Sequence, residues 1–129
     1  MLNKLAELHK LCFPGRPWPA SEFASLKESG AEIIASDHGF IVWRSAADEC
    51  EIITIGVHPD YRGAGIASAM LALMEQDIKG KTVKIFLEVS ADNRPARALY
   101  EKHGYVQVGI RPKYYNGIDA VLMQKVMDI

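Results

Sequence analysis

The sequence has 129 residues, which is enough for one domain with one hydrophobic core. Its formal net charge of −1 at pH 7 gives no strong attraction to nucleic acid or to an anionic membrane, and we expect neither as a partner. No apolar run approaches the length of a membrane span, and the N-terminal segment lacks the continuous apolar core of a signal peptide. The sequence therefore predicts a cytoplasmic protein, in which Cys12 and Cys50 are reduced, buried thiols. No cysteine or histidine cluster has metal-ligand spacing, so we expect no metal.

The first third of the chain predicts two helices and a strand hairpin. An amphipathic first helix is indicated by apolar residues at helical spacing, namely Leu2, Leu5, Leu8 and Cys12. The proline-rich segment 13–19 ends this helix. Ser21 is placed to cap a short second helix that ends near Gly30. Two strands then cover 31–36 and 39–45, joined by a turn at 37–39.

The middle of the chain predicts a strand, a glycine-rich corner and a helix. The strand covers 50–57, and the helix that follows the corner ends at Gly80. We expect one broad apolar face on this helix, formed by Ile66, Met70, Leu71, Leu73, Met74 and Ile78. A further strand covers 82–89, and the strand–helix–strand unit from Cys50 to Val89 predicts a parallel crossover.

The last part of the chain predicts a short helix and a strand hairpin. Asp92 or Asn93 can cap the helix, which ends before Gly104. Strands over 105–115 and 118–127 are joined at Asn116-Gly117, a strong hairpin signal. We therefore expect a single mixed α/β domain over 1–129, with a central, mostly antiparallel sheet flanked by helices.

The glycine-rich corner is the most informative local feature. Arg62 and two glycines stand where a strand ends and a helix begins, an arrangement that suits an anion such as phosphate. A tight turn that requires small residues explains the same glycines. A Rossmann dinucleotide motif is a third interpretation: it needs Gly or Ala where the chain has Ser68, but Glu88 falls where its ribose-binding acid would lie.

The corner resembles a known family signature. The segment from Arg62 to Ala67, Arg-Gly-Ala-Gly-Ile-Ala, is similar to the Arg/Gln-x-x-Gly-x-Gly/Ala motif of the GCN5-related N-acetyltransferase (GNAT) superfamily. The segments 12–19, 87–105 and 111–115 resemble its RimI-type branch, the ribosomal-protein-alanine N-acetyltransferases. This resemblance covers almost the whole chain.

The resemblance implies acetyl-CoA as cosubstrate. The backbone of Ile55, Gly56 and Val57 would run beside the pantetheine arm. The pyrophosphate would be held by Arg62, Gly63, Ala64, Gly65, Ile66, Ala67 and Ser68. Asn93 would contact the cofactor.

The resemblance also implies two catalytic residues, Glu88 as general base and Tyr100 as general acid. Acetyl transfer to an amine requires loss of a proton from the amine and gain of a proton by the leaving sulfur, and a carboxylate and a phenol can perform these steps. On the residues alone, Glu88 can equally be a solvated carboxylate at a strand end. Tyr100 can equally be a core aromatic.

The resemblance implies that Trp18, Tyr114 and Tyr115 line the groove for the acceptor. Trp18 also suits a loop that is pinned to the core, and both interpretations stay open. We expect acetyl transfer to a protein or peptide N-terminus, with alanine of a small-subunit ribosomal protein as acceptor. The alternatives are acetylation of a lysine or a small amine, and a non-catalytic CoA-binding module.

The chain departs from the family pattern in two places. The family fold usually begins with a strand before the first helix; we expect that this strand is either missing or encoded upstream of this sequence. The strand from Ala31 would then stand at a sheet edge that is unprotected unless a partner or a loop covers it. The branch usually carries Arg-x-Ser-Asn where this chain has Ser90-Ala91-Asp92-Asn93. The second difference affects peptide specificity more than cofactor binding.

Overall fold

Helices precede strands at the N-terminal end of the chain, and a strand hairpin closes it. The computed structural model describes residues 2–115 and 117–127, with Tyr115 described by its backbone alone. The described elements are α1 (Leu2–Cys12), α2 (Ala20–Glu28), β1 (Glu32–Ala35), β2 (Gly39–Ala46), β3 (Glu49–Val57), α3 (Ile66–Ile78), β4 (Lys84–Ser90), α4 (Arg94–Lys102), β5 (Val106–Tyr115) and β6 (Ile118–Val126). The predicted hairpin residue Asn116 lies outside the described residues.

The strands pair in the order β1-β2-β3-β4-β6-β5 within the described part of the chain. β1 and β2 are antiparallel, as are β4 with β6 and β5 with β6. β3 and β4 are parallel, with Cys50 opposite Ile85. The predicted parallel crossover is confirmed, because a parallel pair requires a connection such as the one that contains α3.

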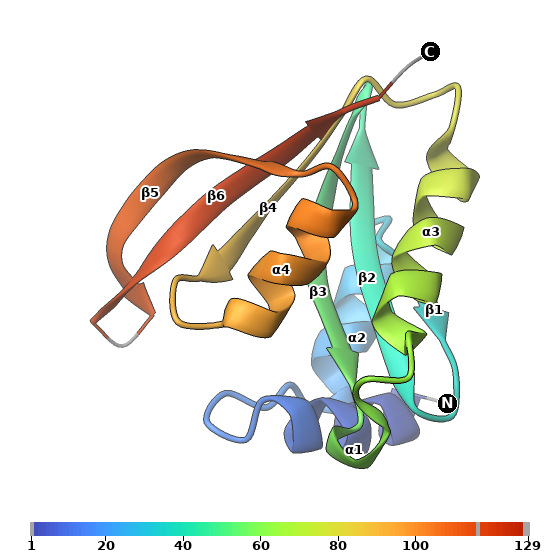
Figure 1. The fold of residues 1–129 in the computed structure, drawn as a ribbon. Helices are drawn as coiled ribbons and strands as arrows, with labels where there is room; N and C mark the ends of the chain where they lie inside the picture. The colour runs from blue at the N-terminus through green and yellow to red at the C-terminus, as the bar shows by residue number, and fades with distance from the viewer. Residues whose placement is uncertain (1, 116, 128–129) are drawn as a thin grey trace. The chain divides into compact units, whose positions relative to one another are not determined.

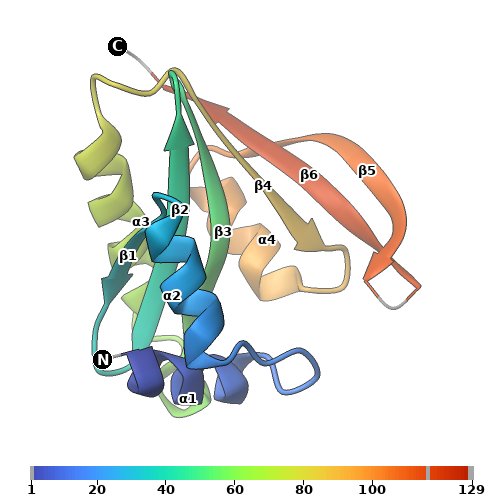
Figure 2. The same ribbon diagram turned by 180° about the vertical axis from the view of Figure 1, so that it is seen from behind.

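The chain divides into two compact units, which we describe separately. The first contains the residues up to Arg44 together with Thr54–Ile78, and the second contains Ser45–Ile53 together with the residues from Lys79 onward. In the first unit, the hairpin of β1 and β2 lies between α2 on one side and α3 on the other (Figures 1 and 2). In the second unit, β5 and β6 form a long twisted ribbon with β4 beside β6 (Figure 1).

An aromatic cluster fills the space between α1, α2 and β2 in the first unit. The His9 ring stacks on Trp18 at a centroid distance of 4.7 Å and lies 5.7 Å from Phe23 and 5.6 Å from Phe40. His9 is 2% exposed, and its Nδ1 accepts a hydrogen bond from the backbone N–H of Trp18. Burial lowers the pKa of His9 to about 4, because the apolar surroundings disfavour the imidazolium. The neutral ring thus fixes the proline-rich loop to the core.

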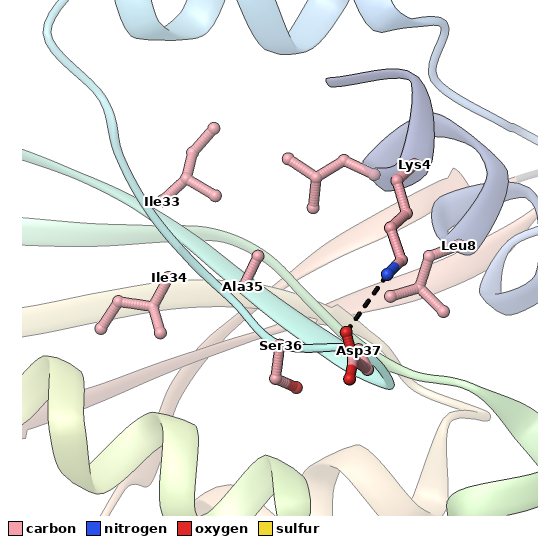
Figure 3. A pocket seen from close by; sticks show the side chains of 8 residues that line it. Lys4, Leu8, Ile33, Ile34, Ala35, Ser36 and Asp37 are labelled. Atoms are coloured by element: carbon pink, nitrogen blue, oxygen red, sulfur yellow. Dashed lines mark hydrogen bonds and ion pairs between the residues drawn. The ribbon is translucent and has the colours of Figure 1, made fainter. Parts of the chain in front are cut away.

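Strand β1 stands at one end of the strand order, at the edge that the sequence led us to expect. A cavity of about 480 Å³ lies between this strand and α1. Figure 3 shows its lining, which consists of Lys4, Leu5, Leu8, Ile33, Ile34, Ala35, Ser36 and Asp37. Lys4 and Asp37 form an exposed ion pair of 3.2 Å across this cavity.

Two local predictions are wrong. Helix α2 begins one residue before Ser21: Pro19 occupies the N-cap position, no side chain caps the helix, and Ser21 lies in its first turn. Proline is well suited to this place because its fixed φ of −72° leads the chain into the helix. Leu73 is 55% exposed, because it lies beside the buried stripe of Met70, Met74 and Ile78 on α3 rather than within it.

Among the described residues, no helix has the length and apolar character needed to cross a membrane.

Candidate active site

The last peptide group of β3 is held on both sides by hydrogen bonds. The carbonyl oxygen of Val57 accepts from the Sγ of Cys12 at 3.2 Å and from the Nε of Arg62 at 3.1 Å. The N–H of His58 donates to the carbonyl of His38 at 2.7 Å. Because both ends of this peptide group are bound, the point at which the chain leaves the strand is fixed.

The glycine-rich corner follows at once. Gly63 and Gly65 have φ values of +85° and +81°, a left-handed conformation in which other residues are strained. Apart from the glycine itself and its two chain neighbours, no atom lies within 4 Å of the position that a Cβ would occupy at either glycine, so the backbone faces open space. The first ladder bond of α3 runs from the Ala69 N–H to the carbonyl of Gly65. The N–H groups of the first turn therefore lie at the open end of the helix, where the helix dipole favours an anion.

The turn between β1 and β2 packs against the segment that leads into the corner. The ring of His38, from the turn between β1 and β2, stacks on Tyr61 at 3.5 Å with an interplanar angle of 8°. The Nδ1 of His58 accepts from the N–H of Asp60, which starts the short 3-10 turn Pro59–Tyr61. Sequence reasoning missed this packing, because a stack between residues 38 and 61 leaves no local signal.

A close contact explains the glycine at position 56. A Cβ there would lie 2.7 Å from the Cζ of Phe40 and 3.0 Å from the Sγ of Cys12. Only glycine fits between these side chains without displacing them. Of the residues predicted to bind acetyl-CoA, Ile55 to Val57 and Arg62 to Ser68 all lie in the first unit, and the chain brings their backbones together at the end of β3 and the start of α3.

Glu88 lies near the end of β4, in the second unit, and is engaged in an ion pair. The side chains of Leu87 and Val89 are buried, so the alternation of the strand places Glu88 on its other face. Its Oε1 accepts from the Nη2 of Arg111 at 2.5 Å, and its side chain is 26% exposed. Arg111 was not among the residues that sequence reasoning singled out.

The other two predicted residues of the second unit have clear structural roles. Tyr100 on α4 is 4% exposed, and its ring packs against Tyr105 at 5.6 Å. Asn93 is the N-cap of α4, where its Oδ1 accepts from the N–H of Ala96, so Asn93 rather than Asp92 caps this helix. Catalysis by Tyr100 and cofactor contact by Asn93 stay predictions.

The three residues predicted to line the acceptor groove lie in different settings. Trp18 stacks on His9, which gives it the loop-pinning role, and its part in a groove stays a prediction. Tyr114 is 45% exposed, and the guanidinium of Arg111 lies 4.6 Å from its ring centre. β5 bulges between Arg111 and Tyr115, and the side chain of Tyr115 lies outside the described part.

Comparison with known proteins identifies the family. A model of the acetyltransferase (GNAT) family matches residues 2–105. The chain belongs to the GNAT acetyltransferase family. This result confirms the predicted family, and it excludes the Rossmann interpretation of the corner. The GNAT family uses acetyl-CoA.

Relatives extend this match over most of the chain. The chain is 35% identical to the N-alpha-acetyltransferase RimI of Mycobacterium tuberculosis, over 95% of this chain and 85% of the relative. It is also 35% identical to an uncharacterized protein of Mycobacterium leprae, of which it spans only 38%. The crystal structure of the ribosomal-protein-S18-alanine N-acetyltransferase from Escherichia coli superposes with a TM-score of 0.89 at 26% identity, covering 99% of this chain and 88% of that one.

The residues of the corner fit the diphosphate of a coenzyme A thioester. Two glycines with open space in place of a Cβ allow close approach to the backbone. The start of α3 supplies N–H donors, and Arg62 supplies a planar cation suited to phosphate oxygens. The corner therefore has both the space and the donors that such an anion needs.

Proposed function

We propose that the protein is an acetyl-CoA-dependent N-acetyltransferase that acts on a protein N-terminal α-amine, with the alanine of a small-subunit ribosomal protein as the acceptor. The observation that carries this proposal is the match to an N-alpha-acetyltransferase over 95% of the chain. It is supported by similarity to the bS18-alanine N-acetyltransferase of Haemophilus influenzae, at 33% identity over 77% of this chain.

A single carboxylate as general base is better suited to an α-amine acceptor than to a lysine side chain, because the α-amine loses its proton more easily. A protein α-amine has a pKa of about 7.7–8.0, against about 10.4 for lysine. At neutral pH, removal of the lysine proton therefore costs roughly 3 kcal/mol more. A single carboxylate acting directly or through one water is better matched to the α-amine.

The proposal assigns the cofactor to the first unit and proton transfer to the second. The corner from Arg62 to Ser68 binds the diphosphate, and the backbone of Ile55 to Val57 lies beside the pantetheine arm. Bound acetyl-CoA supplies the activated acetyl group as a thioester. Glu88 accepts the proton of the attacking amine, and Tyr100 donates a proton to the leaving sulfur.

Arg111 has an assignable part in this scheme. Its guanidinium forms an ion pair with one carboxylate oxygen of Glu88. This ion pair restricts the rotamers of the Glu88 side chain and so favours one orientation of the carboxylate. We therefore treat Arg111 as a positioning residue for the base. We assign contact with an acceptor peptide to Tyr114, and its exposed ring next to Arg111 supports this assignment.

The test is release of CoA from acetyl-CoA with a peptide that begins Ala-Arg, compared with the same peptide blocked at its α-amine. Turnover with the free amine alone supports the proposal. Turnover that is equal with both peptides, when each contains lysine, would move the acceptor to the lysine side chain. Binding of acetyl-CoA without turnover on any amine would leave a CoA-binding module.

A further inference from the structure

The side chain of Arg62 folds back to the end of β3. Its Nε donates to the carbonyl of Val57, so one of its five N–H donors is used to fix the plane of the guanidinium. The same carbonyl oxygen accepts from the thiol of Cys12. A backbone oxygen at the end of a strand thus connects the last residue of α1 to the cation of the corner.

The position of Cys12 allows little movement. Its Sγ lies 3.0 Å from the place where a Cβ of Gly56 would be, and the residue is half-buried. Burial raises the pKa of the Cys12 thiol. The hydrogen bond with Arg62, the charge of Arg62 and the hydrogen bond with Val57 each lower this pKa, but the effect of burial is larger. At neutral pH the sulfur therefore carries the proton that it donates to Val57.

We propose that Cys12 is a positioning residue for acetyl-CoA binding, because it holds the carbonyl of Val57 in the orientation that fixes the guanidinium of Arg62 at the corner. This inference rests on the proposed function. Cys12 itself touches no reacting atom, and it acts through Val57 and Arg62.

The physical gain is preorganisation. An arginine side chain that is free to rotate loses conformational freedom when it binds an anion, and that loss reduces affinity. With its Nε already bound, Arg62 presents its remaining N–H groups from a fixed plane. Without the thiol, the Val57 carbonyl loses one of the two side-chain donors described above and can turn away from Arg62.

The test uses three substitutions of Cys12 that separate hydrogen bonding from packing. Cys12→Ser keeps a donor at nearly the same size, Cys12→Val fills the space without a donor, and Cys12→Ala does neither. The dissociation constant of acetyl-CoA is measured by calorimetry on proteins whose thermal unfolding has been checked. Cys50→Ala is the matched control, because this buried cysteine lies in the second unit.

We expect Cys12→Ala and Cys12→Val to weaken acetyl-CoA binding by about threefold to tenfold, the range for one lost hydrogen bond, and Cys12→Ser to restore it. In combination with Arg62→Met, the change Cys12→Ala should cost nothing further, because its effect runs through Arg62. Cys50→Ala should bind acetyl-CoA like the wild-type protein.

Several outcomes would overturn the inference. Equal affinity of all Cys12 variants would remove any positioning role while leaving the proposed function intact. Restoration by valine but not by serine would show that Cys12 only fills space, and full additivity with Arg62→Met would show that it acts independently of Arg62. If the wild-type protein binds no acetyl-CoA, the proposed function fails instead.

A second measurement covers the case in which Cys12→Ala and Cys12→Val do not fold. In folded Cys50→Ala protein, methanethiolation of Cys12 removes the same S–H donor and is reversed by a reductant. Reversible loss of acetyl-CoA affinity that is absent when Arg62→Met is also present supports the inference, whereas an equal loss with and without Arg62 would show an effect of the added bulk and would overturn it. Unchanged affinity of the fully modified protein would overturn it.

Discussion

The two regions that carry the proposed function depend on different kinds of interaction. The corner between Val57 and Ile66 relies on backbone: two glycines with positive φ, a helix start and a peptide group held by hydrogen bonds. The end of β4 relies on side-chain charge, because Glu88 is held by the guanidinium of Arg111. The first region should therefore be sensitive to backbone strain, and the second to the loss of a single charged group.

This difference separates binding from chemistry. A change in the corner should alter the affinity for acetyl-CoA, whereas a change at Glu88 should alter the rate of transfer with the same affinity. Three of the four predictions below test that separation, beginning with the largest expected effect on rate, and the one at His9 tests the stability of the first unit.

Replacement of the base should have the largest effect on rate. We expect Glu88→Gln to lower kcat by about 100-fold or more, because general base catalysis typically contributes this much, while the Kd of acetyl-CoA stays unchanged. Steady-state kinetics and calorimetry measure the two quantities. Glu49→Gln is a matched control, since Glu49 also forms an ion pair with a basic residue, Lys84 at 3.3 Å, but has no catalytic assignment. An unchanged kcat for Glu88→Gln would show that another group accepts the proton.

The first unit should lose stability in acid because of His9. Its pKa of about 4 in the folded protein lies below the value of about 6.5 expected in the unfolded chain, so the unfolded state binds more protons between these values. The contribution of His9 to stability is complete above pH 6.5 and falls as the pH is lowered toward 4, by about 3 kcal/mol. Urea unfolding of the wild-type protein and of His9→Asn, at pH 7 and pH 4, measures this difference. Equal acid sensitivity of the two proteins would contradict the prediction.

Replacement of Gly65 should introduce backbone strain. An alanine at a φ of +81° should destabilise the fold by about 1 kcal/mol and weaken acetyl-CoA binding, with kcat at saturation little changed. Gly15→Ala serves as the control, since the space around Gly15 is equally open and its φ is not positive. A fall in kcat at Gly65→Ala, with affinity intact, would remove the separation between the two regions.

A smaller effect on rate than at Glu88 is expected at Arg111. The change Arg111→Met should lower kcat by up to about tenfold, because Glu88 loses the partner that keeps it in place, while acetyl-CoA affinity is retained. Arg111→Lys should recover part of the rate, as a single ammonium can pair with the carboxylate without the geometry of the guanidinium. A loss of cofactor affinity in Arg111→Met would place this residue with the binding region instead.

The sequence was most informative where the determinants are local. Gly63 and Gly65 next to Arg62 indicated the corner, and Asn93 followed by Pro95 indicated the start of α4, because each of these patterns reflects the backbone of a few adjacent residues. The helical spacing of α1 was predictable for the same reason, and the parallel crossover was predictable from the order strand, helix, strand.

Contacts between distant residues were not predictable. The pair of Glu88 and Arg111 spans 23 positions and depends on the register of β4, β6 and β5, including a bulge after Arg111. The link from Cys12 to Val57 spans 45 positions. The error at Leu73 has a related cause, since apolar spacing on a helix does not reveal how wide a stripe the rest of the fold covers.

The most direct test of the central claim is to locate the acetyl group on a single acceptor peptide. A peptide that begins Ala-Arg and contains one internal lysine would be incubated with the protein and acetyl-CoA, and the product sequenced by tandem mass spectrometry. We predict that the acetyl group is on the α-nitrogen of the N-terminal alanine. Acetylation of the lysine alone, or of neither nitrogen in a protein that binds acetyl-CoA, would contradict the account.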